Sequence, residues 1–148
     1  MQFNDRLSID APLPQVWNFL IDPQSVGSCG PGVESVEVQD ETHFRAIVKV
    51  GIGQFRARFT VSVEMTELQP PSAAGMRAHA QAPGTAVDAV AHMALEDVGG
   101  TQTVMAWNAD VSISGKLAAV GARLIEWQAN RLIGQTFECI KSKLEAAD

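Results

Sequence analysis

The chain of 148 residues is 46% hydrophobic and 19% charged, which is the size and balance of one globular domain. A chain of this length buries roughly 68–70% of the surface that its unfolded form exposes, so it needs no cross-links in order to fold. Asp and Glu number 17 against 11 Lys and Arg, and the formal net charge of −6 excludes a nucleic-acid backbone as a natural partner.

The cysteines and the amino terminus bear on where the protein works. Cys29 and Cys139 are too few for a disulfide framework or a four-thiolate zinc site, and we expect reduced thiols. Whether the two cysteines approach each other stays open. The first residues have no basic region followed by an apolar stretch, and no segment is long enough to span a membrane, so we expect a cytoplasmic location.

The first 32 residues follow a strand pattern and then a helix pattern. Residues 3–9 alternate between apolar and polar side chains, as in a half-buried strand. Asp10 and the prolines after it predict the start of a short helix that ends near residues 22–23. A second short helix or turn is predicted at residues 24–28, and the Gly-Pro-Gly of residues 30–32 ends it.

Alternating segments separated by turn residues fill the middle of the chain. Together with the first strand and a strand that begins at Val33, they predict about seven strands in hairpin succession, and hence an antiparallel, twisted sheet. Residues 116–145 change to the period of a long helix, with Ser114 as a candidate cap, which we expect to lie on the inner face of the sheet. The alternating segments are residues 44–50, 55–65, 76–80, 87–95 and 105–113.

Small residues gather where the sheet and the final helix are expected to meet. Because interiors are close-packed, small residues that face one another either bring backbones together or leave a space. A curved sheet opposes the first outcome, so we expect an apolar cavity, with a core filled by Phe59, Met93, Met105 and Trp107 as the alternative. The small residues are Ala78, Ala80, Ala82, Ala89 and Ala91 on the strands and Ala118, Ala119, Gly121 and Ala122 on the helix.

No constellation of residues indicates catalysis. Every histidine falls on the polar side of its strand, as do the candidate carboxylates, and solvent is expected to surround them. Gly51-Ile52-Gly53 stands between two strands, where it indicates a tight turn rather than a phosphate loop. We therefore predict no catalytic residues, no metal and no cofactor. The residues weighed are His43, His79 and His92, with Glu64, Asp88 and Asp110.

Four segments, in this order and spacing, resemble the carbon monoxide dehydrogenase CoxG family. That family is part of the SRPBCC superfamily of START-like and Bet v 1-like proteins. The resemblance covers nearly the whole chain and implies an α+β helix-grip fold: a seven-stranded antiparallel sheet wrapped around a long C-terminal helix, with two short helices after the first strand. It also implies one domain over residues 1–148. The segments are residues 16–23, 29–36, 50–57 and 114–123.

The resemblance further implies an accessory protein linked to molybdenum hydroxylases of the carbon monoxide dehydrogenase type, rather than an enzyme. Members of such families carry lipids, isoprenoids, quinones or polyketides, so the expected ligand is a lipid or quinone-like molecule. Longer members have a carboxy-terminal extension suited to a membrane, whereas this chain ends at Asp148. We therefore expect no stable anchor, with reversible contact at the inner face of the membrane as the alternative.

Our leading hypothesis is a carrier whose cavity holds a hydrophobic small molecule. On this hypothesis Gly121 is small because a ligand or the sheet approaches it, so Gly121→Leu is expected to reduce uptake. Two alternatives stay open: an aromatase or cyclase that uses an inward polar group such as Asn18 or Gln128, and an interaction module with a filled core. The candidate ligand-binding residues are Phe44, Phe55, Phe59, Met76, Met93, Met105, Trp107, Leu117, Gly121, Leu124 and Ile125.

Overall fold

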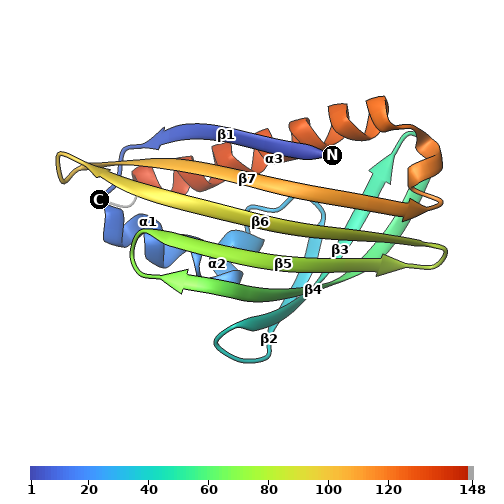
Figure 1. Cartoon of the computed structure of the whole chain (residues 1–148), viewed down its shortest axis with the longest axis horizontal. Helices are drawn as coiled ribbons and strands as arrows, with labels where there is room; N and C mark the ends of the chain where they lie inside the picture. Colours follow the sequence, from blue (N-terminus) through green and yellow to red (C-terminus); the bar gives the residue numbers. More distant parts are fainter. Residues whose placement is uncertain (147–148) are drawn as a thin grey trace.

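The computed structural model describes residues 1–146, which form one antiparallel sheet wrapped around one long helix (Figure 1). The seven strands are hydrogen-bonded in the order β1-β7-β6-β5-β4-β3-β2, so every pair of neighbours except β1 and β7 is also adjacent in sequence. This confirms the predicted helix-grip fold. The strands are β1 (Gln2–Ile9), β2 (Val33–Val38), β3 (His43–Ile52), β4 (Phe55–Gln69), β5 (Ala73–Ala82), β6 (Thr85–Val98) and β7 (Gln102–Gly115).

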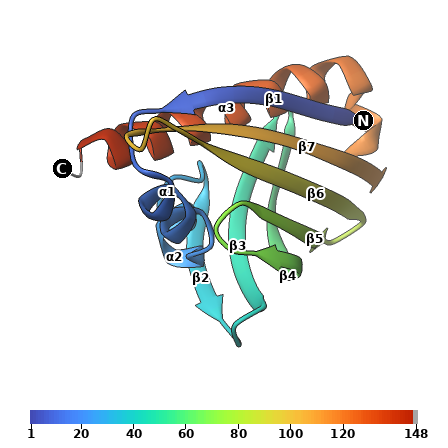
Figure 2. The same ribbon diagram turned by 60° about the vertical axis from the view of Figure 1, so that its left-hand side comes forward.

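The sheet curves around the long helix, so that it has a concave inner face and a convex outer face (Figure 2). Long strands joined by tight hairpins twist strongly, and that twist produces the curvature. Side chains alternate across the sheet as the sequence predicts; on β7, Met105 is buried while its neighbour Ala106 is on the outer side.

Two short helices follow β1 and a long helix ends the described chain. The first two are α1 (Leu13–Leu20) and α2 (Pro23–Gly27), close to the predicted positions. The Asp22 side chain caps α2 by accepting a hydrogen bond from the Gln24 backbone N–H at 3.2 Å. Asp10, predicted to cap α1, instead accepts a hydrogen bond from the Gln102 amide at 2.6 Å.

The long helix begins later than the sequence predicted. Ser114 belongs to β7, and residues 118–120 form a separate 3₁₀ turn, η1 (Ala118–Val120). Gly121 has a φ of 107°, a conformation that only glycine adopts readily, and this breaks the chain direction before α3 (Ala122–Ala146). The small residues before position 122 therefore precede the helix and do not face the sheet from it.

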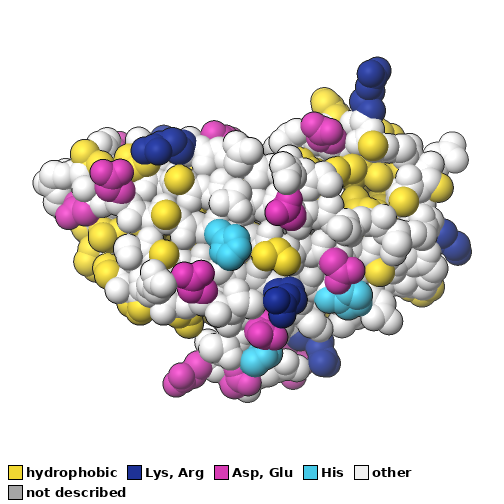
Figure 3. Space-filling model, in the orientation of Figure 1, with side chains coloured by type: hydrophobic (Ala, Val, Ile, Leu, Met, Phe, Trp, Pro, Cys, Tyr) yellow, Lys and Arg dark blue, Asp and Glu magenta, His cyan; other side chains and the backbone are white. Residues whose placement is uncertain are grey.

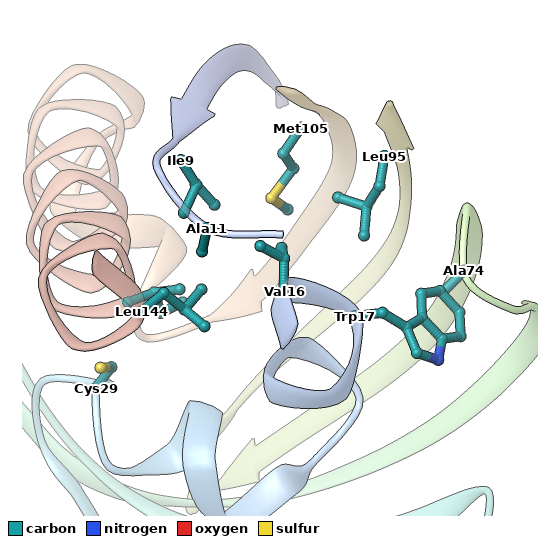
Figure 4. Packing of buried hydrophobic residues seen from close by; sticks show 10 residues of the cluster. Ile9, Ala11, Val16, Trp17, Cys29, Ala74, Leu95, Met105 and Leu144 are labelled. Atoms are coloured by element: carbon teal, nitrogen blue, oxygen red, sulfur yellow. The ribbon is translucent and has the colours of Figure 1, made fainter. Parts of the chain in front are cut away.

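Two packed clusters hold α3 against the sheet, one near each end. At the end of α3, Ile140 and Leu144 pack with Val16 and Trp17 of α1 and with Met105 of the sheet (Figure 4). At the start of α3, Ile125 packs against a second cluster formed by the β3–β4 hairpin and the chain before α3. Its other buried members are Ile52, Phe59, Ala82 and Leu117. No helix within residues 1–146 is apolar over a length that would cross a bilayer.

The structure corrects the expectation of reduced thiols. Cys29, which follows α2, and Cys139 of α3 form a disulfide with their Cα atoms 5.5 Å apart. They are 110 residues apart in sequence, and only the docking of α1 and α2 beneath the end of α3 brings them together. The bond joins two elements that no strand pairing connects.

We expect removal of the disulfide to destabilise the fold. The double variant Cys29→Ala/Cys139→Ala should lose roughly 2–5 kcal/mol of unfolding free energy, because a long loop is no longer closed in the unfolded chain. Guanidinium denaturation of the variant, of the oxidised protein and of the dithiothreitol-reduced protein measures this. The reduced protein should match the variant within the small packing change, whereas equal stability of all three forms would contradict the assignment.

Candidate ligand-binding cavity

A cavity of about 420 Å³ lies between the inner face of the sheet and α3. This volume is within the range of small-molecule sites. Its long walls are the inward side chains of the strands and the middle of α3, and a third wall comes from α1 and α2. The helical wall is formed by Ala129, Ile133, Thr136, Phe137 and Ile140, and the third wall by Leu20, Ile21, Pro23 and Val26.

Small side chains on the sheet make room for the cavity. Ala74, Ala91 and Ala109 line it from three different strands, and Ala91 and Ala109 are directly opposed across β6 and β7. Their methyl groups do not reach the facing side of α3, so the space between the two packed clusters stays open. The prediction of an apolar cavity from the inward alanines is consistent with this geometry.

All five methionines of the chain line this cavity. Thioether side chains are flexible and polarizable, so they adapt to ligands of different shape and make favourable contacts with aromatic rings. Four aromatic residues share the lining, and the rings of Trp107 and Phe137 stack with centroids 5.4 Å apart. The methionines are Met1, Met65, Met76, Met93 and Met105, and the other aromatic residues are Phe3 and Phe44.

Charged side chains are absent from the lining among the described residues. No Asp, Glu, Lys or Arg lines the cavity. His92 is among its residues, but the imidazole is exposed and lies on the outer face, beside Gly75 and the Thr66 hydroxyl. The amino group of Met1 is also exposed and donates to the Val111 carbonyl at 2.9 Å. The interior therefore offers no counter-charge to a buried ion.

Six of the eleven predicted ligand-binding residues meet in this cavity. Five come from inward positions of the sheet, where two-residue alternation fixes the direction of each side chain. The sixth, Ile125, lies in the first turn of α3. They are Phe44, Met76, Met93, Met105, Trp107 and Ile125.

The other five lie elsewhere. Phe55, Phe59 and Leu117 pack in the second cluster, at the closed end of the sheet beyond the cavity. Leu124 is 39% exposed and lies beside Gly53 of the β3–β4 hairpin. A side chain at Gly121 would meet nothing within 4 Å, so its small size serves the backbone turn and not the approach of a ligand. Gly121→Leu is therefore a test of backbone strain rather than of uptake.

The sequence analysis passed over the helical part of the lining. Ile133, Phe137 and Ile140 belong to the predicted apolar stripe, but the break at Gly121 moves the cavity wall two to three turns beyond the residues selected. The walls from α1 and α2 had no distinguishing signal. Asn18 and Gln128, considered for a cyclase, do not line the cavity.

An open hollow of about 520 Å³ on the outer face is a weaker candidate site. It lies over β1, β7 and β6, where Ala94 and Ala106 leave a depression between polar neighbours such as Asn4 and Asn108. Few apolar groups converge there, and within residues 1–146 no cluster of three metal-ligating side chains forms. The apolar cavity under α3 is the better-formed binding site.

The outer face also carries the histidines, which lie at the surface among acidic and basic groups (Figure 3). His79 Nδ1 lies 2.6 Å from the Asp88 carboxylate, and this hydrogen bond raises the pKa of His79 above its ordinary value. His43 bonds to Asp40 at 2.9 Å, which raises the pKa of His43; the Thr42 backbone N–H and this bond together lower the pKa of Asp40 to about 2. These pairs face solvent and not the cavity.

We expect Asp88→Asn to lower the pKa of His79 toward about 6.5, the value of an unperturbed histidine. The protonated ring loses its charged partner, so it releases its proton at lower pH. An NMR titration of the ring Cε1–H signal measures the change. Asp97→Asn, at the far end of the same strand, is the control; identical titration curves in both variants would contradict the pairing.

Comparison with known proteins supports the fold and identifies a family pattern. The family model of the carbon monoxide dehydrogenase component CoxG matches residues 6–145. No curated protein matches the chain. Among solved structures, a conserved protein from Geobacillus kaustophilus is similar over 99% of this chain and 97% of its own, with a TM-score of 0.91 and 22% identity.

More distant structures share the same architecture. The Zhui aromatase/cyclase from Streptomyces sp. R1128 has a TM-score of 0.73 at 14% identity, covering 98% of this chain and 93% of that one. A START superfamily protein from Mycobacterium smegmatis has a TM-score of 0.72 at 10% identity, with 99% of both chains covered. At these identities the likeness shows the fold alone.

Proposed function

Because the chain belongs to the carbon monoxide dehydrogenase CoxG family, we propose that it is a non-catalytic carrier or accessory protein that holds a hydrophobic small molecule. The observation that carries this proposal is the apolar cavity of about 420 Å³ beneath α3. Methionine, aromatic and aliphatic side chains form its walls. Such a lining stabilises an apolar ligand by roughly 25 cal/mol for each Å² of ligand surface removed from water.

The lining favours a neutral ligand over an ionised one. An ion buried without a partner costs several kcal/mol, and no lysine or arginine lines the cavity to offset that cost. An isoprenoid, a quinone or the neutral part of a lipid fits this condition. A fatty acid would have to leave its carboxylate in solvent at the rim.

The family name supports a partner among molybdenum hydroxylases of the carbon monoxide dehydrogenase type. A carrier of a neutral apolar molecule has to collect it from a site where such molecules are stored. Reversible contact with the inner face of the membrane, from the cytoplasm, would supply it there. On this proposal the protein transfers its ligand between a membrane and an enzyme without changing it.

A polyketide cyclase or aromatase is the second candidate function, because a solved structure with that activity in its name shares this fold. Ring closure needs a group that moves a proton inside the cavity. The polar groups near the cavity interior are the Thr136 hydroxyl, which donates to the Leu132 carbonyl at 2.8 Å, and the Trp107 indole N–H. Neither is an efficient proton-transfer group near neutral pH, so the carrier is favoured.

Filling the cavity tests the proposal. Ala91→Leu adds bulk on the inner face of β6 and should weaken binding of the neutral dye N-phenyl-1-naphthylamine at least about fivefold, because the ligand and the new side chain compete for space. Ala94→Leu, on the outer face of the same strand, is the matched control and should leave binding unchanged. Fluorescence titration measures both.

Equal affinity in the two variants and the wild type would place the dye outside the cavity and contradict the proposal. Circular dichroism and the guanidinium midpoint establish that each variant is folded. Conversion of an added polyketide by the purified protein would favour the cyclase instead.

A further inference from the structure

The indole nitrogen of Trp107 is buried and has no hydrogen-bond partner within the part of the chain that the structure describes. A buried donor without a partner costs about 1–3 kcal/mol, so native proteins rarely keep one without a reason. We propose that this N–H is the group that recognises an acceptor oxygen on the cavity ligand. The inference rests on the proposed function and narrows its ligand class.

The position of Trp107 fixes the indole at the cavity wall. On β7 it lies between Asp5 of β1 and Met93 of β6, all three on the inner side of their strands. Its ring stacks on Phe137 of α3 at an interplanar angle of 29°, which links the sheet to the helix across the cavity. The indole is therefore held in one place by a contact that does not use its N–H.

The described chain has no acceptor engaged with this donor. The backbone groups of β7 are taken up by ladders with β1 on one side and β6 on the other. The nearest carboxylate in register, that of Asp5, accepts instead from the Arg6 backbone N–H at 2.7 Å. The Thr136 hydroxyl donates to its own helix. A partner for the indole must then come from outside the chain.

Flexible neighbours control access to the N–H. The ring lines the cavity while its nitrogen is covered by surrounding atoms. Met93 on the next strand and Met105 two residues earlier on β7 share the lining with it, and methionine side chains change rotamer at low cost. A ligand can therefore reach the donor by moving thioethers, with the sheet unchanged.

These features select the chemistry of the ligand. A neutral carbonyl, ester or ether oxygen accepts the hydrogen bond and carries no charge into a cavity that lacks a cation among its described lining residues. A pure hydrocarbon leaves the donor unpaired. The ligand class is therefore an apolar, uncharged molecule with at least one acceptor oxygen set within its apolar body.

The experiment compares two neutral probes of nearly equal shape, 2-acetylnaphthalene and 2-isopropenylnaphthalene, which differ by an acceptor oxygen in place of a methylene. Each displaces N-phenyl-1-naphthylamine from the wild type, from Trp107→Phe and from Trp127→Phe. Trp127 is 58% exposed on α3, under the Arg131 guanidinium, so it controls for the loss of an indole. The ketone-to-alkene affinity ratio should fall about five- to tenfold in Trp107→Phe alone.

The indole N–H resonance of Trp107 gives a second readout that does not depend on a variant folding. In ¹⁵N-labelled wild-type protein it should move downfield with the ketone and stay in place with the alkene. An unchanged affinity ratio in a folded Trp107→Phe, or an equal response of the resonance to both probes, would overturn the inference while leaving the carrier intact. If the wild type binds neither probe nor the dye, the proposed function itself fails.

Discussion

The structure depends on how α3 is held over a curved sheet. Packed clusters fix it near both ends: Ile125 packs against the β3–β4 hairpin, and Ile140 with Leu144 packs against α1 and β7. Between these supports the sheet presents alanines such as Ala91 and Ala109, which are too short to reach the helix. The rigid ends prevent collapse of the middle, so the space persists as a cavity.

The other features of the molecule follow from that arrangement. The cavity needs a side wall, and α1 and α2 supply it; the disulfide between Cys29 and Cys139 joins that wall to the end of α3. Polar and charged groups, including the histidine–carboxylate pairs, are left on the convex face. The chain thus separates a hydrated outer surface from an apolar interior in which methionine side chains can adjust to a ligand.

Sequence patterns predicted the sheet well because alternation directly encodes which side chains point inward. Met76, Met93, Met105 and Trp107 were placed at the cavity on that basis alone. The helical wall was misplaced because a 3.6-residue period does not show where a helix begins, and the turn at Gly121 shifts its start. The disulfide had no local signal, since its partners meet only through the packing of distant elements.

Native mass spectrometry of the protein purified from its own host, followed by organic extraction, tests the central claim most directly. The account predicts a stoichiometric adduct that proves to be a neutral apolar molecule containing an acceptor oxygen. A mass equal to that of the bare chain, unchanged after incubation with quinones and neutral lipids, would contradict it and would favour a cavity used for protein contacts or catalysis.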